Sequence, residues 1–274
     1  MKTTLVIPIL IAIGLVVTYE DSLIGYFQGR RSIGLSAQAS TGVVDAATDS
    51  SEGKNKSSIH AKNDKKLRES SGRPNGANEA LSALLAGNQR FVQGASVHPH
   101  ESSSYRASLA NEQHPFATVL ACSDSRVTPV LIFDQEIGDL FVIRVAGNIV
   151  DDDVTGSIEY AVDHLGAELL VVMGHENCGA VTAAYHSFVA KDLEKREPHE
   201  VETLLTRIEP ALHGIDRKAP QRDQIAQGVE ENVRTSIEQL LRIPDLHSAQ
   251  EEGRMRIAGA IYSLRTGEVR FLED

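Results

Sequence analysis

The chain has 274 residues and a formal net charge of −11, and 41% of its residues are hydrophobic. This composition is typical of a globular protein and excludes collagen-like, coiled-coil and wholly disordered chains. The charge is unevenly distributed: residues 1–78 hold 10 basic and 7 acidic residues, whereas residues 79–274 hold 17 basic and 31 acidic residues. The excess of negative charge in residues 79–274 repels the phosphate backbone of nucleic acids, so nucleic acid is not an expected partner.

An apolar segment, Leu5–Val17, lies close to the N-terminus. A helix of its 13 residues would be about 20 Å long, which is short of the ~30 Å hydrocarbon core of a bilayer. This length favours a signal peptide within residues 1–27. The alternatives are an uncleaved membrane anchor, extended to residues 3–19, and a buried core segment. The first two predict an exported protein that is periplasmic or extracytoplasmic.

Residues 28–78 are rich in Ser, Gly, Ala, Asn and Lys and hold few large apolar side chains. Such a segment cannot bury enough apolar surface to offset the entropy of ordering it. We therefore expect a disordered polar linker over residues 28–78 and a single folded domain over residues 79–274.

The folded part alternates two patterns of apolar residues. Short runs rich in β-branched residues predict strands at 116–121, 140–145 and 168–174. Helical spacing predicts helices at 79–93, 154–165 (with Asp153 as the N-cap), 179–190, 200–212 and 224–241, and a closing hairpin is predicted at 255–263 and 268–272. Near-continuous apolar strands are usually covered on both faces. The predicted fold is an α/β domain with a mainly parallel central sheet flanked by helices.

Polar residues follow the predicted strands directly. Cys122, Asp124 and Arg126 come after the first strand, and His175 and Cys178 come after the third. In open α/β sheets the carboxyl ends of the strands form the functional crevice. These side chains are therefore expected to converge, although 53 positions separate Cys122 from His175.

Cys122, His175 and Cys178 form a candidate zinc site. Two thiolates and an imidazole suit Zn²⁺, and three protein ligands leave a fourth position for water or substrate. One alternative is that both cysteines are small buried apolar residues and that His175 is an ordinary loop histidine. A second alternative is a disulfide, which export would permit but which leaves His175, Asp124 and Arg126 without a role.

Asp124 and Arg126 suggest a function beyond structure. Asp124 is either a fourth zinc ligand, which closes the site, or the partner of Arg126, which turns it away from the metal to accept a hydrogen bond from bound water. Without the neighbouring cysteines, this spacing is most often a solvated ion pair.

These motifs resemble the β-class carbonic anhydrases. The resemblance covers about Glu79 to Asp274 and rests on C-x-D-x-R at Cys122–Arg126 and H-x-x-C-G at His175–Gly179, with VIRVAGN at 142–148 and SIEYAV at 157–162 between them. It implies that the Cys, His and Cys bind zinc and that Asp124 and Arg126 form the catalytic dyad. The implied activity is the reversible hydration of carbon dioxide to bicarbonate and a proton, a lyase reaction.

The resemblance also implies a substrate pocket. Gln113 matches a glutamine that holds carbon dioxide across a dimer interface, Phe141 and Tyr160 match aromatic residues of the pocket wall, and Gly179 follows the last ligand. A homodimer, or a homotetramer built from dimers, is the expected assembly. Val119 stands where some bacterial members have a tryptophan that helps form an inhibitory bicarbonate pocket, so this chain departs from the family pattern at that pocket.

Two other functions are alternatives to carbon dioxide hydration. One is a related zinc hydrolase that acts on carbonyl sulfide or carbon disulfide through the same metal site. The other is a zinc-stabilised interaction protein without turnover, which the presence of Asp124, Arg126 and Gln113 argues against.

Overall fold

The computed structural model describes residues 73–97, 102–192 and 197–273. In this part of the chain five strands form one sheet in the order β2-β1-β3-β4-β5. Pairing is parallel from β2 through β4, and β5 runs antiparallel to β4. The strands are β1 (Ala117–Ala121), β2 (Leu140–Arg144), β3 (Leu169–His175), β4 (Arg256–Tyr262) and β5 (Val269–Phe271). The predicted α/β class and the closing antiparallel pair are both confirmed.

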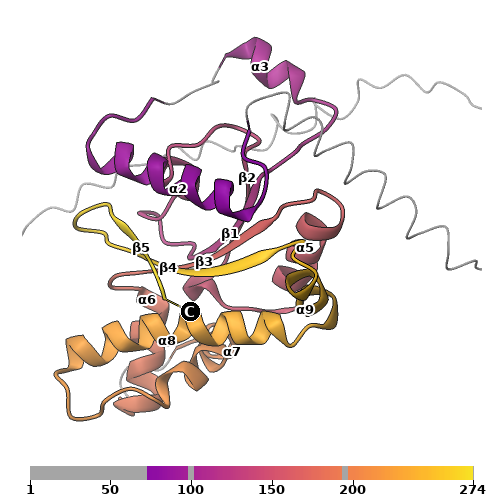
Figure 1. Cartoon of the computed structure of the whole chain (residues 1–274). Helices are drawn as coiled ribbons and strands as arrows, with labels where there is room; N and C mark the ends of the chain where they lie inside the picture. The colour runs from indigo at the N-terminus through magenta and orange to yellow at the C-terminus, as the bar shows by residue number, and fades with distance from the viewer. Residues whose placement is uncertain (1–72, 98–101, 193–196, 274) are drawn as a thin grey trace, which may run out of the picture. The chain divides into compact units, whose positions relative to one another are not determined.

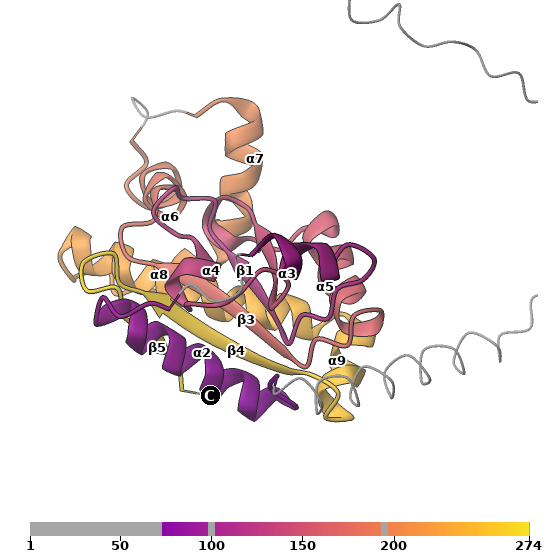
Figure 2. The ribbon, with the colours of Figure 1, turned by 90° about the horizontal axis from the view of Figure 1, so that it is seen from above.

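Helices cover both faces of the sheet (Figure 1). One face carries α2 (Ala77–Val92) with the short α4 (Pro129–Ile132) against it. The opposite face carries α5 (Asp152–Asp163), α8 (Gln221–Leu241) and α9 (Pro244–Glu251). Figure 2, seen from above, also shows α2 and α8 on opposite sides of β4. The near-continuous apolar strands follow from this arrangement, because side chains of both orientations are buried.

Alternate residues of each strand enter different cores. Val119 and Val171 pack with Leu84 of α2, whereas Leu120 and Val172 pack with side chains of α5 and α8. The helix α2 lies very close to the chain below it, because a Cβ at Gly87 would overlap the carbonyl oxygen of Phe133. Only glycine fits this contact, which fixes α2 against the segment after α4.

The structure corrects the start of α5. This helix spans Asp152–Asp163 and its N-cap is Asp151, not Asp153 as predicted. The Asp151 side chain accepts a hydrogen bond from the backbone N–H of Val154 at 2.8 Å. Each of the three successive aspartates has a carboxylate that can cap a helix, so the sequence did not identify which of them is the N-cap.

Two predicted helices are each divided. The segment predicted at 179–190 forms α6 (Gly179–Ala184) and then a π-helical turn, η2 (Tyr185–Val189). The segment predicted at 200–212 forms α7 (His199–Ile208) and a 3₁₀ turn, η4 (Glu209–Leu212). Pro210 lies in η4 and has no N–H for the α-helical ladder, which explains the second division. Four short elements were not predicted: α3 (Ser103–Ser108), α4, α9 and the 3₁₀ turn η1 (Ala146–Asn148).

The folded part begins before the predicted boundary at Glu79. Arg73 forms an ion pair with Asp139 at 3.1 Å and donates a hydrogen bond to the hydroxyl of Tyr105 at 2.7 Å. Residues 73–78 therefore belong to the fold rather than to the predicted linker. The rest of that linker and the apolar segment at 1–27 lie outside the described residues. Within the described ranges, no helix has both the length and the apolar character needed to cross a bilayer.

Candidate metal centre

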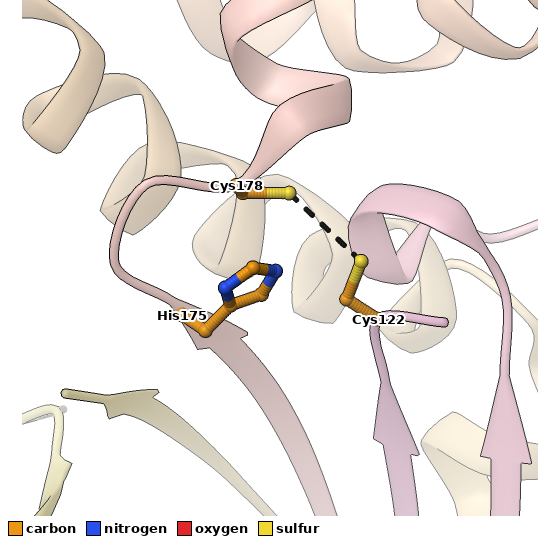
Figure 3. A group of neighbouring side chains, drawn as sticks. All are labelled: Cys122, His175 and Cys178. Atoms are coloured by element: carbon orange, nitrogen blue, oxygen red, sulfur yellow. Dashed lines mark hydrogen bonds between the residues drawn. The ribbon is translucent and has the colours of Figure 1, made fainter. Parts of the chain in front are cut away.

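Three donor side chains meet at the carboxyl ends of β1 and β3 (Figure 3). The register pairs Ala121 with Met173, so Cys122 lies beside the last residues of β3, next to His175. Cys178 is the N-cap of α6, three residues beyond His175. The ligand atoms of these three residues all lie within 4.8 Å of one another, and all three residues are buried. The predicted convergence of Cys122, His175 and Cys178 is therefore a feature of the structure.

The imidazole of His175 faces the two sulfurs (Figure 3). Its Nδ1 lies 2.9 Å from the carbonyl oxygen of Glu176, an acceptor that favours the tautomer with the proton on Nδ1. Nε2 then presents a lone pair to the cluster. This nitrogen is fully buried and has no hydrogen-bond partner among the described residues. A buried acceptor without a donor is costly, and a metal ion in the cluster would satisfy it.

The two sulfurs share a hydrogen bond and lie 4.0 Å apart. Both cysteines are free, and this separation is about twice the ~2.05 Å of a disulfide bond. The hydrogen bond from the Cys178 thiol, together with His175 and the Gly147 N–H, holds the pKa of Cys122 below its usual value against the opposing effect of burial. The same pairing, together with burial, raises the pKa of Cys178. One sulfur is thus poised as a thiolate, the form that binds metal.

This donor set fits zinc. Two cysteine sulfurs and one imidazole nitrogen are typical ligands of Zn²⁺, and three protein ligands are the usual number at a catalytic site. Within the described part of the chain, Nε2 of His175 is buried without a hydrogen-bond partner, and a bound metal ion would supply that partner. Zinc is therefore the cofactor of this site, and Cys122, His175 and Cys178 would hold it.

Asp124 is held by Arg126 beside the cluster. Its Oδ1 accepts hydrogen bonds from the Arg126 backbone N–H and from Nε, both at 2.9 Å, and its Oδ2 accepts one from Nη2 at 2.7 Å. These hydrogen bonds hold the pKa of Asp124 far below its usual range, so the carboxylate is ionised. Oδ2 also lies 4.0 Å from Nε2 of His175. Of the two predicted arrangements, the structure has the one in which Asp124 pairs with Arg126.

A second arginine supports the loop that carries Cys122 and Asp124. Arg144, the last residue of β2, donates hydrogen bonds to the carbonyl oxygens of Cys122 at 3.2 Å and Asp124 at 2.7 Å. Both contacts are to the backbone, so they set the direction of the loop rather than the charge of a side chain. No sequence pattern identified Arg144, because its partners are backbone groups 20 and 22 positions away.

The predicted substrate residues lie elsewhere in the chain. Phe141 pairs with Thr118 in the β1–β2 register. Thr118 lies four residues before Cys122, so Phe141 is offset from Cys122 by about 13 Å along the strands, at ~3.3 Å per residue. Tyr160 on α5 contacts Phe141, with ring centroids 6.3 Å apart. Gln113 is exposed and precedes β1, at the end of the strand opposite to Cys122. A single chain therefore does not bring Gln113, Phe141 and Tyr160 to its own cluster, whereas Gly179 follows Cys178 directly.

Glu176 lies within the ligand loop, between His175 and Cys178, but its side chain is exposed. Its Oε2 accepts a hydrogen bond from Ser263 Oγ at 3.0 Å. Glu176 and Asn177 also line a cavity of about 820 Å³ with residues of α8 and the β4–β5 turn. Cys122, His175 and Cys178 do not line this cavity, so it is separate from the metal centre.

Comparison with known proteins agrees with this geometry. The profile of the family described as "Carbonic anhydrase" matches residues 117–269. A carbonic anhydrase of Mycolicibacterium smegmatis is 38% identical over 191 residues, which cover 69% of this chain and 90% of that protein. The chain therefore belongs to the carbonic anhydrase family.

Solved structures define the class within the family. The beta-carbonic anhydrase CcaA superposes with a TM-score of 0.57 at 29% identity, covering 71% of this chain and 95% of that one. One of two tetrameric beta-carbonic anhydrases from Sordaria macrospora gives a TM-score of 0.57 at 27% identity, covering 72% and 98%. Together with the Cys–His–Cys cluster, these neighbours place the chain in the β class.

The metal content of the purified protein tests the ligand set. We expect about one zinc ion per chain, and Cys178→Ser should lose most of it because the remaining two ligands chelate weakly. Elemental analysis after gel filtration measures both. His213→Ala is the matched control, since the side chain of this histidine is exposed and faces Glu209. Full zinc content in Cys178→Ser would contradict the assignment.

Proposed function

We propose that this chain catalyses the zinc-dependent reversible hydration of carbon dioxide to bicarbonate and a proton. The observation that carries the proposal is the buried cluster of Cys122, His175 and Cys178 with an ionised Asp124 beside it. The family membership and the β-class neighbours support it. A bound zinc ion acts as a Lewis acid that makes water a nucleophile near neutral pH.

Asp124 orients the nucleophile in this proposal. An ionised carboxylate can only accept hydrogen bonds, so a water or hydroxide beside Oδ2 must direct its proton toward Asp124. Its lone pair is then directed away from the carboxylate, toward the substrate. Arg126 keeps the carboxylate ionised and fixes its plane through two side-chain hydrogen bonds. Arg126 thereby also keeps Asp124 from turning inward to become a fourth ligand.

The substrate pocket is completed by a second chain in this proposal. Gln113, Phe141 and Tyr160 lie toward the amino ends of β1 and β2, away from their own Cys122. β2 is an edge strand, and Tyr160 is 47% exposed beside it. A partner that packs against this edge would receive the amide of Gln113 and the apolar rings of Phe141 and Tyr160. We therefore propose a homodimer as the functional unit, and the tetrameric relatives from Sordaria macrospora are compatible with dimers that pair further.

We also propose that the enzyme acts outside the cytoplasm. The support is the apolar segment Leu5–Val17, read as part of a signal peptide or an uncleaved anchor at residues 1–27. A polar linker would then separate this segment from the catalytic domain. The enzyme would interconvert carbon dioxide and bicarbonate in an extracytoplasmic compartment.

Replacement of Asp124 by asparagine tests its role. We expect Asp124→Asn to retain zinc but to lose at least about 100-fold in carbon dioxide hydration, because an amide can donate a hydrogen bond and misorient the nucleophile. Stopped-flow hydration assays measure the rate, and parallel assays with carbonyl sulfide and carbon disulfide identify the substrate class. Glu238→Gln removes an exposed carboxylate on α8 and should behave as the parent. Parental turnover in Asp124→Asn would exclude the proposed role.

Complementation between two inactive variants tests the shared site. In a mixed dimer of Asp124→Asn and Gln113→Ala chains, one zinc site has both defects and the other has none if Gln113 serves the partner. Random assortment on co-expression then restores about a quarter of the parental activity. If Gln113 serves its own chain, every site keeps one defect and activity stays at the level of the separate variants. Activity of the co-purified chains decides between the two.

A further inference from the structure

Two buried polar side chains of α8 bind the turn that follows β2. Asn232 Nδ2 donates a hydrogen bond to the carbonyl oxygen of Gly147 at 2.7 Å, and Ser236 Oγ donates one to that of Asn148 at 3.2 Å. Asn232 and Ser236 are four residues apart and share one face of the helix. They are 2% and 3% exposed, so these hydrogen bonds offset the cost of burying an amide and a hydroxyl.

The same turn contacts a metal ligand. The backbone N–H of Gly147 donates a hydrogen bond to Sγ of Cys122 at 3.2 Å. Gly147 has φ 70° and ψ 18°, in the left-handed region, and a Cβ there would lie 2.7 Å from Cδ1 of Ile208. Conformation and space both require glycine at this position.

Glycine is also the residue least able to hold its own conformation. Rotation about the backbone bonds of Gly147 changes the angle between its N–H and its carbonyl, so the direction of the N–H is not fixed by the residue itself. Asn232 fixes the carbonyl of Gly147, and Ser236 fixes the next carbonyl. The helix α8 thereby determines where the N–H of Gly147 points.

We propose that Asn232 and Ser236 are positioning residues for the metal centre, which hold the Gly147 N–H on the sulfur of Cys122. The inference rests on the proposed function, since it requires a resident zinc ion. A hydrogen bond to a thiolate withdraws charge from the sulfur, and a fixed donor also fixes the side chain of the ligand. Supporting contacts of this kind alter metal affinity by about 10- to 100-fold when they are removed.

The binding of cobalt(II) to the metal-free full chain tests this inference. Cobalt replaces zinc and reports its sulfur ligands through thiolate-to-metal charge-transfer absorption. Asn232→Leu removes the amide and keeps a similar volume. We expect its cobalt affinity to fall about 10-fold or more because Cys122 is less fixed. The charge-transfer band should move to lower energy because the sulfur has lost its hydrogen bond.

Gln224→Met provides the matched control. Gln224 is also buried on α8 and donates a hydrogen bond to a backbone carbonyl, that of Ala219 at 2.7 Å, but this carbonyl lies in the loop before α8 and not in the turn that donates to Cys122. Both variants lose a buried amide, so both should lose stability in urea denaturation. Only Asn232→Leu should change cobalt affinity and the absorption band. Equal changes in the two variants would show a general loss of stability and overturn the inference.

The remaining outcomes are also decisive. Parental cobalt affinity and absorption in Asn232→Leu overturn the inference but leave the proposed function intact. If Asn232→Leu does not fold, Ser236→Ala, which removes one hydroxyl, must shift both readouts in the same direction by a smaller amount, and no shift overturns the inference. Failure of the parent chain to bind cobalt would instead contradict the proposed function.

Discussion

The burial of three donor atoms against one another is the constraint on which this structure depends. The sulfurs of Cys122 and Cys178 and Nε2 of His175 are within 4.8 Å of each other and nearly inaccessible to water. Without a metal ion the electron pairs of these donor atoms lack full partners. One sulfur is poised as a thiolate, and the imidazole nitrogen receives no hydrogen bond from the described residues. A divalent cation satisfies all three donors at once. The β1–β3 pairing that brings them together is thus a functional requirement as well as a feature of the core.

The surroundings of the cluster divide into two parts with different tasks. On one side, Arg126 holds Asp124 as an ionised acceptor, and Arg144 holds the backbone that carries it. On the other side, Asn232 acts on Cys122 through the backbone of Gly147. Most of these contacts are to backbone groups. The loops at the carboxyl ends of the strands are therefore fixed by side chains from β2 and α8 that do not themselves reach the metal.

The sequence predicted the centre of the fold well because the relevant signals are local. Apolar runs predicted β1, β2 and β3 to within a residue or so, and parallel strands bring Cys122 and His175 to the same edge of the sheet. Short elements such as α4 and α9 were missed because four to eight residues contain little periodic pattern. The N-cap of α5 was misplaced among three equivalent aspartates.

Other features depend on contacts that no sequence pattern records. Arg144, Asn232 and Ser236 bind carbonyl groups 20 to 88 positions away, and any donor of suitable length could bind a carbonyl. The left-handed turn at Gly147 was visible only as a glycine within a motif. The distance of Phe141 from Cys122 follows from the strand register, which the sequence did not supply. The proposal that a partner chain completes the substrate pocket therefore rests on this register.

A crystal structure of the zinc-loaded enzyme at mildly alkaline pH, with anomalous diffraction recorded at the zinc edge, would identify the metal ligands and the position of Asp124. We expect one strong anomalous peak bonded to Cys122, His175 and Cys178, with the Asp124 carboxylate still paired with Arg126. A metal bound elsewhere, or two sulfurs bonded to each other in active crystals, would contradict it. Asp124 bonded to zinc under these conditions would contradict the part of the account that assigns it to the nucleophile.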